Sequence, residues 1–158
     1  MMSSENNERT RYAGASMRLV WQWVWAQIFE GVARAGYDDL NPAHVGLFRH
    51  PTLGGRRLTE IAQQMQITKQ SVHELVSHLQ ARGYLVREPD PVDRRARIVV
   101  LTKKGRQLES LVRDQAHRAE EQVAAILGPR RFAQLQKALE TIIAELPPAG
   151  GGPDQLST

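Results

Sequence analysis

The chain has 158 residues, of which 41% are hydrophobic and 24% are charged, so it can bury one modest core, or a core and an oligomer interface. It contains no cysteine, which excludes disulfides, thiol sensing and a cysteine-ligated zinc site. The formal net charge of +4 favours a polyanionic partner, and because no apolar run reaches membrane-spanning length we expect a cytoplasmic protein with no membrane partner.

The first helix is predicted over residues 12–36, after a polar N-terminus that we expect to be flexible at residues 1–11. Gly36 ends the helix. Its apolar residues form one broad stripe: Met17, Val20, Trp21, Val24, Trp25, Ile28, Phe29 and Val32. This stripe is wider than a small domain needs to cover one side of a helix, so it predicts a partner. Trp21 and Trp25 are more typical of core or dimer packing than of a ligand site, and we expect Trp23 to be exposed.

The next helix begins at Asn41, a good N-cap, with Pro42 in its first turn and Pro51 at its end. Residues 52–57 then have the composition of a loop. His44 and His50 flank this helix, but no two histidines of the chain have the i, i+4 spacing of a helical metal site. We therefore predict neither a metal nor another cofactor.

Two short helices follow, over residues 58–65 and 69–82. For the second, Thr68 is a suitable N-cap and Gly83 a suitable C′ residue. One face of this second helix is apolar, and the other carries polar side chains: Lys69, Gln70, Ser71, His73, Glu74, Ser77 and His78. The pattern indicates a helix-turn-helix with a polar second helix, although many helical hairpins share it.

A β-hairpin is predicted next, with strands at residues 84–87 and 97–101 and a turn at residues 88–93. Between residues 87 and 106 there are seven basic and three acidic residues, and their net charge of +4 equals that of the whole chain. Such a cluster can be a solvated face. Its place at a loop tip beside a polar helix favours contact with a polyanion instead.

Two long helices complete the predicted fold. Thr102 caps the first, over residues 103–127, and Gly128 and Pro129 separate it from the second, over residues 129–146. The second helix has the near-heptad apolar spacing of helix-on-helix packing. Its apolar residues are Phe132, Leu135, Leu139, Ile142, Ile143 and Leu146. Residues 147–158 are rich in glycine and proline and predict a disordered tail.

Four segments of the chain carry recognisable motifs: LTEIA at residues 58–62, LQARGYL at 79–85, DRRAR at 93–97 and LTKKG at 101–105. Through them the sequence resembles the multiple-antibiotic-resistance-regulator (MarR) family of transcription factors, whose D-x-R and L-T-x-x-G signature the last two segments match. The resemblance implies a mainly α fold with a β-hairpin wing. A winged helix-turn-helix at residues 37–102 would lie between N-terminal and C-terminal dimerisation helices at residues 12–36 and 103–146. A symmetric homodimer presents two recognition helices about one DNA turn, roughly 34–36 Å, apart and so reads a palindromic operator.

The resemblance assigns the major groove to the helix at residues 69–82. Gln70, Ser71 and His73 are then expected at base edges, and Lys69 at a base or a phosphate. Glu74 departs from the family, whose members often have a basic or neutral polar residue at that position.

The hairpin would be the wing that lies along the DNA backbone. By the family pattern, Arg95 enters the minor groove and the carboxylate of Asp93 orients it. Arg94 and Arg97 are expected to contact phosphates.

Similar proteins are usually repressors that a small, often phenolic or anionic, effector releases from DNA. The family pattern places that effector beside the first helix. We expect Trp21 and Trp25 to form an aromatic wall there, with His44 or Arg49 as a polar partner.

Three other functions share features of this sequence. A winged helix can dock a protein, but the exposed residues of the second helix are polar. An architectural protein that binds DNA without sequence preference stays open. An enzyme needs a nucleophile–base pair or a metal cluster, and Ser71 with His73 or His78 lacks a recognisable third member, so we predict no catalytic site.

Overall fold

The computed structural model describes residues 12–49 and 54–146, and it confirms the predicted fold class, mainly helical with a small β-sheet. The elements follow in this order: α1 (Ala13–Arg34), α2 (Pro42–Phe48), β1 (Arg56–Arg57), α3 (Leu58–Met65), α4 (Lys69–Ala81), β2 (Leu85–Pro89), β3 (Arg97–Leu101), α5 (Lys103–Leu127) and α6 (Pro129–Glu145). The predicted flexible N-terminus at residues 1–11, the predicted tail at residues 147–158, and Pro51 lie outside the described residues.

Three helices begin at the caps that the sequence predicted. In each, the side-chain oxygen of the cap accepts a hydrogen bond from the backbone N–H three residues later, at 3.0 Å for Asn41 and 3.1 Å for Thr68 and Thr102. Each bond satisfies a donor that the first turn of a helix leaves without a partner. Between α3 and α4, Gln66 takes a left-handed conformation with φ 55°. The turn of the helix-turn-helix is therefore closed by local interactions.

The sheet has three antiparallel strands in the order β1-β3-β2. β2 and β3 form the predicted hairpin, with Leu85 opposite Leu101 and Pro89 opposite Arg97. The prediction of a loop up to residue 57 was wrong at its end, because Arg56 and Arg57 pair with the free edge of β3. A strand of two residues is too short to show an alternating pattern, so the sequence carried no signal for it.

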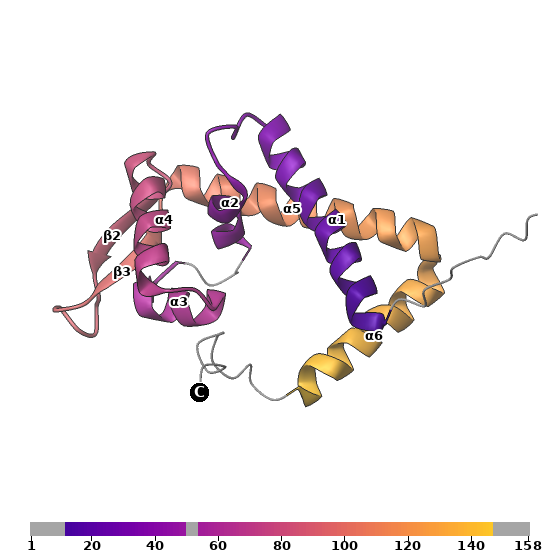
Figure 1. Cartoon of the computed structure of the whole chain (residues 1–158). Helices are drawn as coiled ribbons and strands as arrows, with labels where there is room; N and C mark the ends of the chain where they lie inside the picture. The colour runs from indigo at the N-terminus through magenta and orange to yellow at the C-terminus, as the bar shows by residue number, and fades with distance from the viewer. Residues whose placement is uncertain (1–11, 50–53, 147–158) are drawn as a thin grey trace, which may run out of the picture.

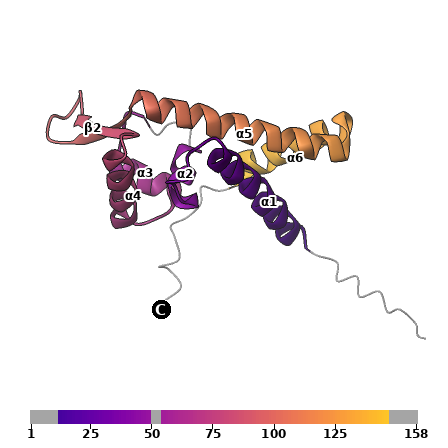
Figure 2. The ribbon, with the colours of Figure 1, turned by 90° about the horizontal axis from the view of Figure 1, so that it is seen from above.

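α5 runs the length of the molecule, from the wing at one end to α6 at the other (Figures 1 and 2). α1 crosses α5 and packs mainly on it, while α3 and α4 lie together near the wing. The core joins these parts, with Val32, Val45, Val76, Leu79 and Leu108 fully buried. The DNA-reading half predicted from the sequence is thus packed directly on the long helices.

Much apolar surface of the terminal helices stays exposed. At the N-terminal end of α1, Met17 and Val20 are 50% and 52% exposed, and α6 has no buried residue. In α6, Ile143 is 70% exposed. Within residues 12–49 and 54–146, no helix combines the length and apolar character needed to cross a bilayer.

Candidate nucleic-acid interface

α4 presents a polar face to solvent because its other face is locked into the core. Val72, Val76 and Leu79 are fully buried, which fixes the rotation of the helix about its axis. Lys69 and His73 are exposed on the opposite face. In the part of the chain that the structure describes, neither of these two side chains has a hydrogen bond or an ion pair. Both are therefore available to a partner.

Gln70 and Ser71 have local partners in the free protein. The side-chain amide of Gln70 donates to Oε1 of Glu74 at 2.8 Å, and the hydroxyls of Ser71 and Thr68 lie 2.8 Å apart. Glu74, the residue that departs from the family pattern, thus holds the amide in one direction. A base contact by Gln70 has to keep or exchange this hydrogen bond.

The wing carries three arginines whose charges are free to meet a partner. Arg94, Arg95 and Arg97 are exposed, and among the described residues their side chains have no hydrogen-bond or ion-pair partner. Two other arginines of the same segment are engaged: a guanidinium nitrogen of Arg87 donates to Oγ of Ser77 at 3.0 Å, and one of Arg106 donates to the carbonyl of Leu101 at 2.8 Å. Of the five arginines in the predicted cluster, the three at the wing are thus the ones available to a partner.

Asp93 contacts the backbone of the wing. Its Oδ1 accepts a hydrogen bond from the N–H of Arg95 at 3.1 Å, and its Oδ2 lies 3.8 Å from the guanidinium of Arg57. Within the described residues it makes no contact with the guanidinium of Arg95. Its predicted role as the orienting carboxylate therefore stays a prediction, and in the free protein the available link to Arg95 is the main chain.

Sequence reasoning missed the carboxylate that organises the wing, Asp90. Its side chain is 9% exposed and accepts hydrogen bonds from Nε of Arg57 at 2.7 Å and from the N–H groups of Val92 and Asp93 at 2.8 and 3.2 Å. The bonds from Val92 and Arg57 hold the pKa of Asp90 below its usual value. The Asp-Pro turn signal marks Asp90, but nothing in the sequence marks Arg57 as its partner.

The structure brings together three of the four predicted effector residues. The rings of Trp21 and Trp25 stack with centroids 6.2 Å apart, and the guanidinium of Arg49 lies over both, 4.8 and 5.4 Å from the ring centroids. Burial lowers the pKa of Arg49. Arg49 and the two rings form a cation–π cluster at the junction of α1 and α2.

His44 is not part of this cluster. It is buried, its Nδ1 accepts a hydrogen bond from the N–H of Asn41 at 3.2 Å, and its ring stacks on that of His78 in α4 with centroids 3.7 Å apart. His44 is the third residue of α2, and the capping interaction with Asn41 turns its ring toward α4. The expectation of His44 as a polar partner of the two tryptophans is therefore not supported by its position.

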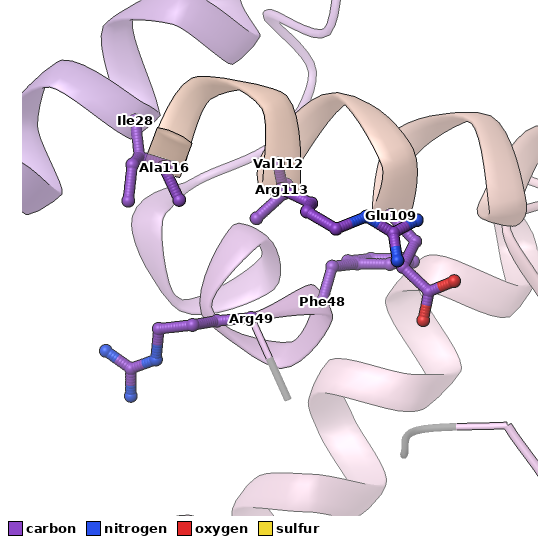
Figure 3. Close-up of a pocket in the computed structure, with 7 residues that line it drawn as sticks. All are labelled: Ile28, Phe48, Arg49, Glu109, Val112, Arg113 and Ala116. Carbon is purple, nitrogen blue, oxygen red and sulfur yellow. The ribbon is translucent and has the colours of Figure 1, made fainter. Parts of the chain in front are cut away.

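A cavity of about 230 Å³ lies where α1, the end of α2 and α5 meet (Figure 3). Its apolar lining comes from all three helices, and its charged residues come from the last two. The lining residues are Ile28, Phe48, Arg49, Glu109, Val112, Arg113 and Ala116. In Figure 3 the guanidinium of Arg49 points away from the carboxylate of Glu109 and the guanidinium of Arg113, so the cavity has an arginine on each side and a carboxylate on one. Sequence analysis did not single out Arg113, because a basic residue on an exposed helix face gives no pocket signal.

Comparison with known proteins agrees with this geometry. The profile of the MarR family matches residues 38–96, while no curated protein sequence matches the chain. The solved transcriptional repressor CouR, bound to a 23-mer DNA duplex, is 28% identical with a TM-score of 0.68, and the match covers 90% of this chain and 99% of that one.

Two further structures have the same fold. A crystal structure of MarR is 21% identical with a TM-score of 0.72, covering 87% of this chain and 92% of that one. CouR from Rhodococcus jostii RHA1, bound to p-coumaroyl-CoA, is 21% identical with a TM-score of 0.65, covering 84% of this chain and 92% of that one. The resemblance drawn from the sequence motifs and the predicted winged-helix fold are both confirmed.

Proposed function

We propose that this chain, a transcriptional regulator of the MarR family, binds a palindromic DNA operator as a homodimer and acts in the cytoplasm as a repressor. The observation that carries the proposal is the pairing of an exposed polar face on α4 with unpaired arginines on the adjoining wing. α4 packs against β2, so the two surfaces lie side by side at one end of the molecule (Figure 1). The protein acts by binding and not as an enzyme.

In the proposed complex α4 enters the major groove. Gln70, Ser71 and His73 meet base edges, and Lys69 meets a base or a phosphate. All four lie in the first half of the helix, where Lys69, Gln70 and His73 are exposed and Ser71 is half-buried. The exposed face of this helix is polar, and this favours DNA over a docked protein as its partner.

The wing carries the second contact. Arg95 enters the minor groove, whose narrow A·T tracts attract a cation, and Arg94 and Arg97 neutralise phosphates. These three side chains are exposed and without partners among the described residues, so no existing ion pair has to be broken when DNA binds.

A second copy of the chain supplies the partner that the terminal helices require. The exposed apolar residues of α1 and α6 lie at the end of the molecule that is remote from the wing (Figures 1 and 2). Burying such surface against a second copy is favourable at about 25 cal/mol per Å² of apolar area. The two-fold symmetry of the dimer would then match that of a palindrome.

We propose that an aromatic or anionic effector regulates the complex from the cavity between α1, α2 and α5. The apolar lining of the cavity suits an aromatic ring, and Arg49 and Arg113 suit an anionic group. Trp21 and Trp25 hold the guanidinium of Arg49 by cation–π contacts. CouR, which has the same fold, has been solved both with DNA and with p-coumaroyl-CoA. By linkage, an effector that weakens DNA binding by some factor is itself bound more weakly to the DNA complex by the same factor.

Binding to selected and scrambled duplexes at several salt concentrations tests the proposal. We expect the selected operator to bind about 10³-fold or more tightly than the scrambled duplex. Gln70→Ala and Ser71→Ala should each cost about 1–3 kcal/mol and relax the preference at one base position. Equal affinity for both duplexes would mean a non-specific architectural protein, and light scattering that shows a monomer in the same buffer would refute the homodimer.

A further inference from the structure

Arg57 joins two parts of the DNA-reading region that are far apart in the sequence. β1, which carries Arg57, forms one edge of the sheet, and Asp90 follows β2 at the other edge, with β3 between them. The guanidinium nevertheless reaches Oδ2 of Asp90, with Nε at 2.7 Å and a terminal nitrogen at 2.6 Å. This contact ties the strand before α3 to the base of the wing.

The carboxylate of Asp90 has a partner on each oxygen. While Oδ2 accepts from Arg57, Oδ1 accepts from the N–H groups of Val92 and Asp93. The main chain closes the same turn, since the N–H of Asp90 donates to the carbonyl of Ala96 at 3.1 Å. Charge-assisted hydrogen bonds are about twice as strong as neutral ones, so the conformation of the turn depends on this one carboxylate staying in place.

From Asp90 the contacts continue to the DNA-facing residues. The guanidinium of Arg57 also lies 3.8 Å from Oδ2 of Asp93, and Oδ1 of Asp93 accepts from the N–H of Arg95. A series of contacts therefore runs from Arg57 to the backbone N–H of Arg95. The side chain of Arg95 is not part of this series and stays free.

Arg57 differs from the arginines of the wing because its positive charge already has a partner inside the protein. Its hydrogen bond to Asp90 raises its pKa, and its cation is neutralised within the protein. Arg94, Arg95 and Arg97 have no such partner in the described ranges. Arg57 is thus occupied inside the protein, whereas the other three are available to phosphate or to the minor groove.

We propose that Arg57 and Asp90 form a positioning pair that holds the wing in its DNA-binding conformation in the free protein, before DNA binds. The proposal rests on the proposed function, because the wing is taken as the part that enters the minor groove. With the turn already ordered, Arg95 reaches DNA without the cost of ordering the loop. Loss of the pair therefore weakens operator binding although neither residue touches DNA.

The test compares Asp90→Asn and Arg57→Gln with their double variant. Asparagine keeps an oxygen for the N–H groups of Val92 and Asp93, so Asp90→Asn breaks the contact with Arg57 selectively. We expect each single variant to bind the operator about three- to tenfold more weakly, as for the ordering of one long side chain. The double variant should bind no more weakly than the weaker single variant. Tighter or unchanged binding by Asp90→Asn, or additive losses in the double variant, would overturn the proposal.

Arg56→Gln is the matched control. Arg56 lies beside Arg57 in β1, is also half-buried, and has no ion pair among the described residues, so the substitution removes the same charge without touching Asp90. We expect it to leave the ratio of operator to scrambled-duplex affinity unchanged. The two single variants of the pair should lower that ratio, and an equal fall in the control would overturn the proposal.

Hydrogen exchange in the protein without DNA separates this proposal from the proposed function. In both single variants the amides of Val92 and Asp93 should exchange at least tenfold faster, while the buried turns of α4 and α5 exchange as in the wild type. Unchanged exchange at Val92 and Asp93 would overturn the positioning role. Faster exchange in a protein that binds no duplex at all would support that role and reject the proposed DNA-binding function instead.

Discussion

The glycine of the LTKKG segment offers a sharp test of how the wing is joined to α5. Gly105 is buried in the first turn of α5, and a Cβ placed on it would overlap the carbonyl oxygen of Tyr84 and lie 3.2 Å from Cδ2 of Leu101. That oxygen cannot yield easily, because it accepts hydrogen bonds from the N–H and the hydroxyl of Thr102 at 3.1 and 3.0 Å. Gly105→Ala should therefore push the start of α5 away from Tyr84 and the start of β2.

The expected loss follows from three contributions. Overpacking at a rigid site costs about 1–3 kcal/mol, and disturbing the Thr102 cap costs about 1 kcal/mol. The higher helix propensity of alanine offsets about 1 kcal/mol of this loss in the free energy of unfolding. The net loss is about 1–3 kcal/mol, which for a chain of this length lowers the melting temperature by about 2–12 °C.

Gly46→Ala is the matched control. Gly46 lies inside α2, and a Cβ there would meet Trp25 at 3.9 Å, an ordinary van der Waals contact. The same substitution should therefore stabilise the protein by about 0.5–1 kcal/mol. Thermal unfolding of both variants at one protein concentration provides the comparison, since a dimer makes the melting temperature depend on concentration. A Gly105→Ala protein as stable as the wild type would refute the close approach to Tyr84.

Three further predictions concern the wing, the buried histidines and the terminal helix. Asp93→Ala should weaken operator binding, although it removes a negative charge, and should change little once Arg95 is alanine; tighter binding by the single variant would reject the orienting role. Burial lowers the pKa of His44, and the neighbouring His78 and Arg82 act in the same direction. The contribution of His44 to the free energy of unfolding should therefore be constant above about pH 7. It should fall as the pH drops below 6.5, because the unfolded state takes up the proton first. In His44→Gln, whose side chain can still accept from the N–H of Asn41, urea unfolding at pH 5 and 7.5 should show a smaller difference. Deleting residues 129–158 removes α6 and should cause aggregation or unfolding. A soluble truncated protein with full operator affinity would contradict a dimer that buries the apolar faces of the terminal helices.

Local patterns carried most of the fold prediction. The caps at Asn41, Thr68 and Thr102 and the break at Gly128 act within one helical turn, so residues adjacent in sequence are enough to place them. The amphipathic spacing of α4 likewise predicted which of its faces is buried. Family motifs added the role of the hairpin as a wing and the assignment of Arg95 to the minor groove, because the D-x-R and L-T-x-x-G positions are read from the sequence directly.

Contacts between distant residues were decided only by the tertiary structure. Arg57 and Asp90 are separated by 33 positions, and nothing before folding distinguishes Arg57 from its neighbour Arg56. His44 and Arg49 lie at opposite ends of the same short helix, yet only Arg49 reaches the tryptophans, since the cap at Asn41 turns His44 toward α4. The type of a residue and its local sequence pattern therefore determined the helix or strand that it joins. Its contact partner depended on which elements pack together, because side-chain contacts extend only a few ångströms in space, whatever the separation along the chain.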